Sequence, residues 1–268
     1  MGDISYAPLI EDMTWSYSRL KAFESCKQNW FLRYIRGVKD IPCFYTNYGS
    51  FMHRILEGYY SGKLTKQQML TEFLIHFRDE VKGQRPDGKI VNKYILSGTS
   101  YISSFEPFDL ESLWVEKRCS FSVEGRQFVG VIDFLGRSKD GELYLIDHKS
   151  RELKPRSGRA NPTVKDRELD DMLRQLYLYC VPVFEEFGCF PNFLCFNCFK
   201  NGENGALIKE PFHKEAFEEA KRWALDLIRQ IEAEEDFDPN PDYFFCKWLC
   251  GVNDKCQTYA DEMSDRRR

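Results

Sequence analysis

The chain has 268 residues, of which 43% are hydrophobic and 30% charged, a composition typical of a soluble globular protein with a proper core. The formal net charge of −4 argues against indiscriminate binding of polyanions, although charge can still gather locally. No stretch approaches the roughly 18 apolar residues of a membrane span, and the first residues lack the basic and apolar regions of a signal peptide. We therefore expect a cytoplasmic protein without membrane contact.

The first hundred residues have the periodicity of helices. One helix is predicted from Ser16 through SYSRLKAFESCKQNWFLRYI, and a second in SFMHRILEGYY. Two more are predicted at 65–82 and 93–104, separated by the prolines and glycines of 83–88. A helical N-terminal part at 16–110 follows from this pattern.

Strand patterns begin at about residue 113 and continue to 149. A helix is then predicted over 166–187, followed by a second hairpin, NFLCFNCFK and ALIKEPF, around a turn rich in Gly and Asn. An amphipathic helix follows at 213–235, and an irregular tail at 236–268 contains closely spaced cysteines. This order predicts one α/β domain over 1–268, whose core at 111–235 is a mixed β-sheet flanked by helices.

The most informative stretch is GVIDFLGRSKDGELYLIDHKS, in which two apolar runs flank a turn at Lys139–Gly141. If Gly141 takes the left-handed position of a three-residue loop, the pairing places Asp133 directly across from Asp147. Two like charges so close destabilise a sheet unless a cation lies between them. Lys149, two residues beyond Asp147, projects from the same face. Two carboxylates and an ammonium group thus indicate a metal-dependent site that cleaves phosphodiesters.

A solvated edge hairpin, whose acids simply face water, is the alternative interpretation. It is less consistent with the sequence, because both acids interrupt strongly apolar segments, where an unpaired charge is costly to bury.

The ordered set of motifs resembles the PD-(D/E)XK nuclease superfamily, in particular its RecB-like exonuclease clade. The motifs are the opening helix SYSRLKAFESCKQNWFLRYI, the histidine motif YGSFMHRILE, then GVIDF, LIDHKS and QLYLY. The resemblance runs from about Ser16 to Cys256 and implies a restriction-endonuclease-like core with a central mixed sheet.

The resemblance also implies roles for single residues. Mg²⁺ or Mn²⁺ would be held by His53, Asp133, Asp147 and the backbone carbonyl of His148. Lys149 would position the attacking water and stabilise the charge that develops on the phosphate. Gln175 and Tyr179, which share a helical face, would shape the site and hold the nucleic acid, and Glu57 would support it from one turn beyond His53.

A basic run follows the second carboxylate motif and includes Lys154, Arg156 and Arg159. Such a run is usually a solvated loop, but beside a site that cleaves phosphodiesters it is a candidate for contact with the nucleic-acid backbone.

Ten cysteines in a cytoplasmic chain do not suggest disulfides. Cys180, Cys189, Cys195 and Cys198 are predicted to be small core residues. Members of the resembled clade, including AddB nucleases and CRISPR-adaptation nucleases, hold a [4Fe–4S] cluster with one early and three late cysteines. By that resemblance the ligands would be Cys26, Cys246, Cys250 and Cys256. Structural Zn²⁺ is the alternative cofactor, and the spacing Cys-x₃-Cys-x₅-Cys departs by one residue from the family pattern.

The sequence therefore predicts a stand-alone, metal-dependent DNA exonuclease acting on DNA that is single-stranded or has free ends. No GxxxxGK[ST] motif occurs, so a helicase or recombination partner would be a separate chain. Endonuclease activity is open within the same chemistry. A non-catalytic or redox-regulated DNA-binding subunit of a larger complex is the alternative from another class.

Overall fold

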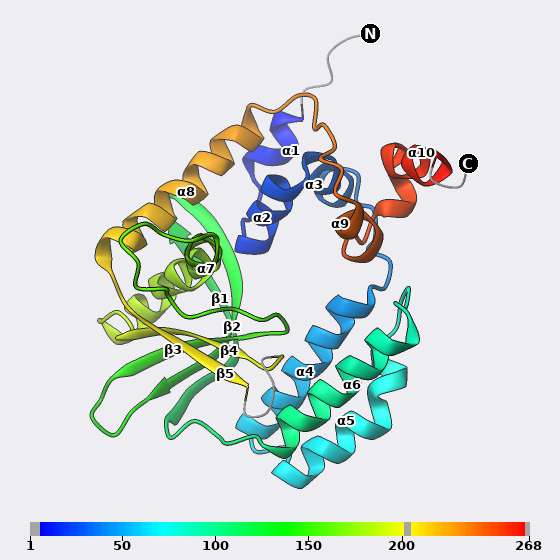
Figure 1. Ribbon diagram of the computed structural model, residues 1–268. Coiled ribbons are helices and arrows are strands. Elements are labelled where there is room, and N and C mark those ends of the chain that lie inside the picture. Colours follow the sequence, from blue (N-terminus) through cyan, green and yellow to red (C-terminus); the bar gives the residue numbers. More distant parts are fainter. Residues whose placement is uncertain (1–5, 201–204, 266–268) are drawn as a thin grey trace.

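The computed structural model describes residues 6–200 and 205–265, and its centre is one five-stranded sheet in the order β1-β2-β3-β4-β5 (Figure 1). The strands are β1 (Glu111–Val123), β2 (Arg126–Arg137), β3 (Leu143–Lys149), β4 (Phe193–Cys198) and β5 (Ala206–Pro211). β3 and β4 are parallel, and the other neighbours are antiparallel. The sheet is therefore mixed, and the predicted α/β class is confirmed.

Helices flank this sheet and form a separate group at one end. The early ones are α1 (Ala7–Glu11), α2 (Tyr17–Ser25), α3 (Lys27–Tyr34), α4 (Phe44–Tyr60), α5 (Lys66–Glu80) and α6 (Gly88–Ser103). The later ones are α7 (Val164–Phe187), α8 (Lys214–Glu232), α9 (Tyr243–Trp248) and α10 (Gln257–Asp265), with a 3₁₀ turn at Asn253–Lys255. Helix α7 makes the crossover that a parallel β3–β4 pair requires.

The apolar side chains form two large clusters and a small one. The main core joins β1–β5 to α2, α3, α7 and α8, with Leu145, Leu176 and Ile228 among its buried members. A second cluster holds α4, α5 and α6 together around Tyr48 and Phe73. In Figure 1 these three helices lie side by side, apart from α7 and α8. Helix α4 thus carries its residues to the sheet from a separately packed unit.

The predicted opening helix is wrong as a single element, because it is broken at Cys26. This residue is extended, with φ −164° and ψ 111°, and its sulfur accepts a hydrogen bond from the backbone N–H of Asn29. Cys26 therefore ends α2 and caps α3, a role that helical periodicity does not reveal.

Other boundaries differ by a few residues. Helix α4 begins at Phe44, ahead of the predicted Ser50, and α6 begins at Gly88 because the Asp87 carboxylate accepts hydrogen bonds from the first N–H groups. The second hairpin is confirmed by the antiparallel β4–β5 pair, and its turn includes 201–204, outside the described residues. The tail, predicted to be irregular, contains α9 and α10.

All ten cysteines have free thiols. Three of the four predicted core cysteines are buried, whereas Cys189 is exposed beyond the end of α7, so that assignment was wrong. No helix within the described residues is long and apolar enough to span a membrane.

Candidate metal centre and nucleic-acid cleft

The hairpin between β2 and β3 has the predicted register. Gly141 has φ +86°, its N–H donates to the Ser138 carbonyl, and Ser138 N–H donates to Glu142 at 2.9 Å. The ladder then runs from Arg137 opposite Leu143 to Phe134 opposite Ile146. The next residue on each strand is the predicted carboxylate, Asp133 or Asp147.

The two strands part at the carboxylates. There the backbone N–H of His148 donates to Oδ2 of Asp133 at 2.7 Å. A carboxylate therefore accepts the hydrogen bond that a backbone carbonyl would accept in a regular β-ladder. β3 meanwhile stays paired with β4 as far as Lys149 opposite Cys198. Asp133 and Asp147 therefore lie in the opening of a forked sheet, and both are buried.

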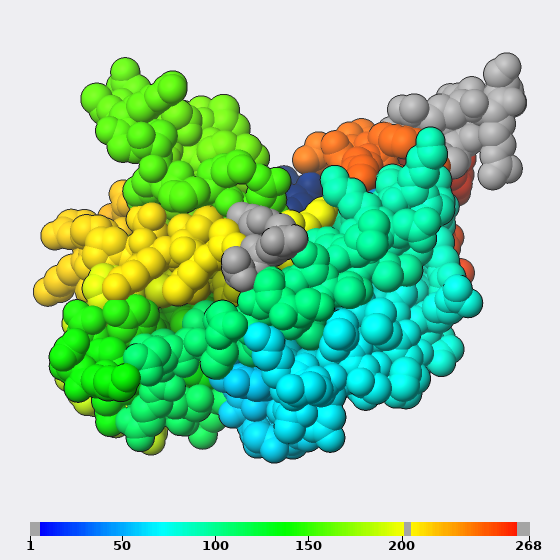
Figure 2. Space-filling model, turned by 60° about the horizontal axis from the view of Figure 1, so that its bottom comes forward, coloured from blue at the N-terminus to red at the C-terminus, as the bar shows by residue number. Residues whose placement is uncertain are grey.

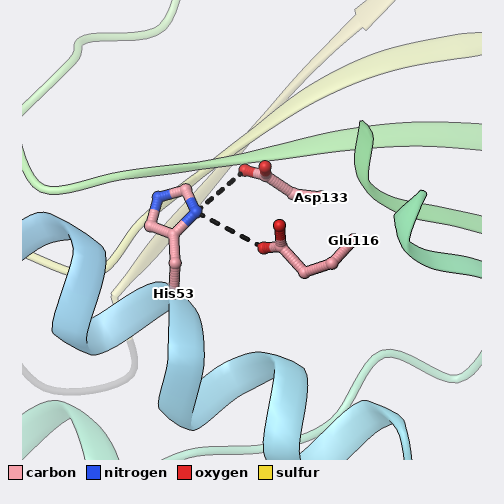
Figure 3. Close-up of side chains that lie close together, drawn as sticks. All are labelled: His53, Glu116 and Asp133. Carbon is pink, nitrogen blue, oxygen red and sulfur yellow. Dashed lines mark ion pairs between the residues drawn. The ribbon is translucent and has the colours of Figure 1, made fainter. Parts of the chain in front are cut away.

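His53 reaches this opening from α4, as Figure 3 shows. Its Nδ1 lies 3.4 Å from Oδ2 of Asp133 and 3.7 Å from Oε1 of Glu116. His53, Glu116 and Asp133 can each offer one ligand atom to a cation, and these atoms lie within 4.8 Å of one another. A metal centre can therefore form between α4, β1 and β2.

Glu116 was not predicted from the sequence. It lies on β1 between the pairs Val115–Phe134 and Lys117–Ile132, which places it opposite Asp133, and it has φ +46°. The signal was present, because Glu116 interrupts the strand-like run LWVEKRCSF much as Asp133 interrupts its own strand.

His148 supports the same place with its backbone and its ring. Its carbonyl oxygen lies 2.8 Å from Nε2 of His53, whereas the carboxylates face Nδ1. Its Nδ1 is 2.9 Å from Nδ2 of Asn197, and this amide donor leaves the imidazole proton on Nε2. The His148 carbonyl can thus hold the His53 ring in orientation, a common arrangement around metal-binding histidines. Its predicted role as a metal ligand stays a prediction.

Lys149 is held by its neighbours, in contrast to a mobile surface lysine. Its ammonium group lies 2.6 Å from Oδ2 of Asp147 and donates to Oε1 of Gln175 at 2.9 Å. The Gln175 amide in turn lies 3.4 Å from the Tyr179 hydroxyl. Gly130 leaves room for this tyrosine, because a Cβ there would lie 2.4 Å from the Tyr179 ring. A chain of contacts therefore runs from Asp147 through Lys149 and Gln175 to Tyr179, and it joins residues of β3 and α7 beside β2.

The ionisable groups of the site shift one another's pKa values. Burial opposes ionisation of His53, but the Asp133 carboxylate raises its pKa to about 10. Burial likewise opposes ionisation of Asp133, yet His53 lowers the pKa of that carboxyl to about 2. Burial raises the pKa of Asp147 to about 6, with Lys149 opposing and Asp133 adding to the shift. Burial also lowers the pKa of His148 to about 3, so that ring is neutral.

The residues fit a hard divalent cation. Oε1 of Glu116 and Oδ2 of Asp147 are buried, and each faces a basic group, His53 at 3.7 Å and Lys149 at 2.6 Å respectively. Carboxylate oxygens and an imidazole are ligands that Mg²⁺ and Mn²⁺ accept. Because Oε1 of Glu116 accepts no hydrogen bond from the described residues, a cation beside His53 would satisfy it.

A cleft of about 1170 Å³ leads to these residues, above the usual range of roughly 300–1,000 Å³ for small-molecule pockets. Its lining includes His53, Lys149, Gln175 and Tyr179, and it continues past α2, β1 and α9. Figure 2 shows the molecule hollowed between the green segment near residue 155 and the orange segment near α9, with the blue N-terminal helices below.

Three predicted basic contacts lie on the loop after β3, and two of them are already paired. Lys154 pairs with Glu152, and Arg156 pairs with both Glu210 and Asp170. The Arg159 side chain has no partner within the described residues. Glu57, predicted to support the site, instead pairs with Lys63 at 3.3 Å.

The four predicted cofactor cysteines meet in one small pocket, across more than 200 residues of sequence. They are Cys26, Cys246, Cys250 and Cys256, and Asn29 lies beside them. The side-chain amide of Asn29 donates to the Cys250 sulfur at 3.1 Å, while its backbone N–H donates to Cys26.

Comparison with known proteins agrees with this geometry. The sequence pattern of the PD-(D/E)XK nuclease superfamily matches residues 14–257, and the chain belongs to that superfamily. A search of curated proteins gave no match. The solved structure of a "Putative exonuclease" from Eubacterium rectale is similar, with TM-score 0.51, 13% identity, and coverage of 96% of this chain and 93% of that one. A second solved structure, SSO0001, has TM-score 0.32, 16% identity, and coverage of 94% and 95%.

Proposed function

We propose that this protein is a metal-dependent DNA exonuclease of the RecB-like type. The observation that carries the proposal is the meeting of Asp133, Asp147, His53 and Lys149 at the fork of the sheet, where His53 and Lys149 line an open cleft. The superfamily and the structural neighbour support a nuclease in general. The RecB-like role rests on the ordered motifs.

Each residue has a role that its contacts support. His53, Asp133 and Asp147 would hold Mg²⁺ or Mn²⁺, with Glu116 as a further carboxylate beside His53. Such a cation supplies a water of lowered pKa and neutralises charge on the phosphate oxygens. Lys149 donates toward the developing oxyanion, because its ammonium group is already aimed into the site.

Gln175 and Tyr179 act through Lys149 and along the cleft. Gln175 keeps the ammonium group oriented, and Tyr179 keeps Gln175 in place. Arg159 is the member of the basic loop whose side chain is available to a phosphate, because Lys154 and Arg156 are paired with carboxylates. A substrate with a free end, and single-stranded there, suits a cleft whose carboxylates are buried.

We also propose that the cysteine pocket holds a [4Fe–4S] cluster. The resemblance to nucleases with one early and three late cysteine ligands favours the cluster over structural Zn²⁺. Four cysteines around one pocket match the Cys₄ ligation that such a cluster requires. Its ligands would join α3 to the C-terminal segment and so serve stability more than chemistry.

The test is digestion of DNA labelled at the 5′ or 3′ end, single- or double-stranded, with Mg²⁺, Mn²⁺ or EDTA. We expect metal-dependent release of nucleotides from one end, abolished in Asp147→Ala. A covalently closed circle should resist cleavage, and its cleavage would indicate an endonuclease. Binding of DNA without any metal-dependent cleavage would instead support the non-catalytic subunit.

A further inference from the structure

Helix α9 forms one wall of the cleft that leads to the candidate metal centre. Phe245 and Leu249 line this cleft together with His53 and Lys149, although they lie about 200 and 100 residues further along the chain. Leu249 is 38% exposed, and Phe245 is partly buried. An apolar wall beside a nuclease site needs an explanation, because a phosphate backbone gains nothing from it.

The wall is anchored to the rest of the molecule. The N–H of Ile41 donates to the Gly251 carbonyl at 2.7 Å, and the Cys43 thiol donates to the Trp248 carbonyl. The Asp242 carboxylate caps α9 by accepting from the N–H of Phe245. Phe245 also lines the cysteine pocket on its other side. The aromatic ring is therefore presented by a fixed element, which a binding contact requires.

Positive charge lines other parts of the same cleft. Arg118 of β1 is exposed and has no hydrogen-bond or ion-pair partner within the described residues. Lys149 lies at the metal centre, and Lys21 of α2 also lines the cleft but is paired with Glu24 and Asp171. The cleft thus combines cations with an apolar wall, as proteins that bind single-stranded nucleic acid do.

We propose that α9 is a base-contacting wall, so that one DNA strand lies in the cleft with bases against Phe245 and Leu249. The phosphates of this strand face Arg118 and Lys149. A duplex has its bases stacked inside and offers only its backbone and groove edges, so the α9 contact selects single strands. This inference rests on the proposed nuclease function and adds the part of the chain that recognises the strand.

The experiment measures binding without cleavage. Fluorescence anisotropy in EDTA compares a labelled oligothymidine with an abasic strand of the same length, for the wild type and for Phe245→Leu, Leu249→Ala and Arg118→Ala. Phe244→Leu is the matched control, because Phe244 is on the same helix and 52% exposed but packs against Tyr45 outside the cleft. Arg222→Ala, an exposed change on α8, is the control for Arg118.

The wild type should bind oligothymidine more tightly than the abasic strand and than a duplex. Phe245→Leu should weaken binding of oligothymidine about fivefold or more and leave the abasic strand unchanged, since stacking on an aromatic ring contributes about 1–3 kcal/mol per base. Leu249 lines the cleft but not the cysteine pocket, so Leu249→Ala should show the same selectivity with a smaller loss of affinity. Arg118→Ala should weaken both strands alike and reduce the salt dependence.

Equal effects of Phe244→Leu and Phe245→Leu, or an equal loss for both strands in the α9 variants, would overturn the proposal. So would a wild type that binds the duplex or the abasic strand as tightly as oligothymidine. Cleavage by the wild type is measured separately with Mg²⁺. A protein that shows the α9 selectivity but never cleaves would contradict the proposed function and leave the strand-binding contact established.

Discussion

Gly130→Ala should damage the candidate site without touching any of its charged groups. Gly130 lies on β2, and a Cβ there would be 2.4 Å from Cε1 and 2.9 Å from both Cζ and the hydroxyl oxygen of Tyr179. Ordinary contact begins at 3.4 Å, so the ring must move by about 1 Å. The Tyr179 ring is buried against the main core and cannot turn freely away.

The expected cost has two parts. Overpacking a well-packed core costs about 1–3 kcal/mol, and for a chain of this size each kcal/mol lowers the melting temperature by about 2–4 °C. Movement of Tyr179 also removes the support of Gln175, which holds Lys149. Misplacement by about 1 Å near reacting groups can reduce a rate on the order of 10²-fold.

A double-mutant cycle checks this reasoning. Melting curves and cleavage of labelled DNA are measured for Gly130→Ala, Tyr179→Ala and the double variant. Once the ring is gone, the alanine at position 130 should cost no further stability, which gives a coupling energy of about 1–3 kcal/mol. If Gly130→Ala destabilises Tyr179→Ala as much as it does the wild type, then the clash is not the cause.

Three further results are expected. Lys149→Ala should reduce the cleavage rate on the order of 10²-fold or more and still bind Mn²⁺, whereas Asp147→Ala should lose both cleavage and Mn²⁺ binding. Cleavage assays and calorimetry measure the two properties. Loss of Mn²⁺ binding in Lys149→Ala would contradict the assignment of Lys149 to chemistry and of Asp147 to the metal. His53, with a pKa of about 10, must release a proton to bind metal, so Mn²⁺ affinity should rise about tenfold per pH unit between about pH 7 and 8. The rise should be steeper below about pH 6, where Asp147 also holds a proton. A pH-independent Mn²⁺ affinity would refute this. Cys26→Ser should lower the melting temperature and abolish the broad absorbance near roughly 400 nm of anaerobically purified protein, while the exposed Cys189→Ser should change neither.

The sequence predicted the hairpin well because its register depends on local chemistry. A glycine in the left-handed conformation fixes the turn, and a period of two then carries the register from Ser138 to Phe134, the neighbour of Asp133. The helical face shared by Gln175 and Tyr179 is equally local, and the structure brings both to Lys149.

Contacts between distant segments could not be predicted in this way. The sequence predicted that the basic loop contacts nucleic acid, but Arg156 is paired with Glu210 of β5 and Asp170 of α7, which approach it only in the folded chain. The approach of α9 to the cleft likewise depends on its packing against residues 41–45. Neither contact leaves a periodic signal in the sequence.

Glu116 lies between these cases, because its position was predictable and its role was not. The residues Glu124 and Gly125 both have positive φ, as in the two-residue turn that joins Val123 to Arg126, and counting back from that turn places Glu116 opposite Asp133. Opposed residues share a face, so a second acid beside Asp133 follows from the register alone. What makes it part of the site is His53, which α4 brings between the two carboxylates from a separately packed helical unit. The metal centre is therefore assembled by the docking of α4 on the sheet, and variants that loosen this docking should lose metal binding before they lose the fold of the sheet.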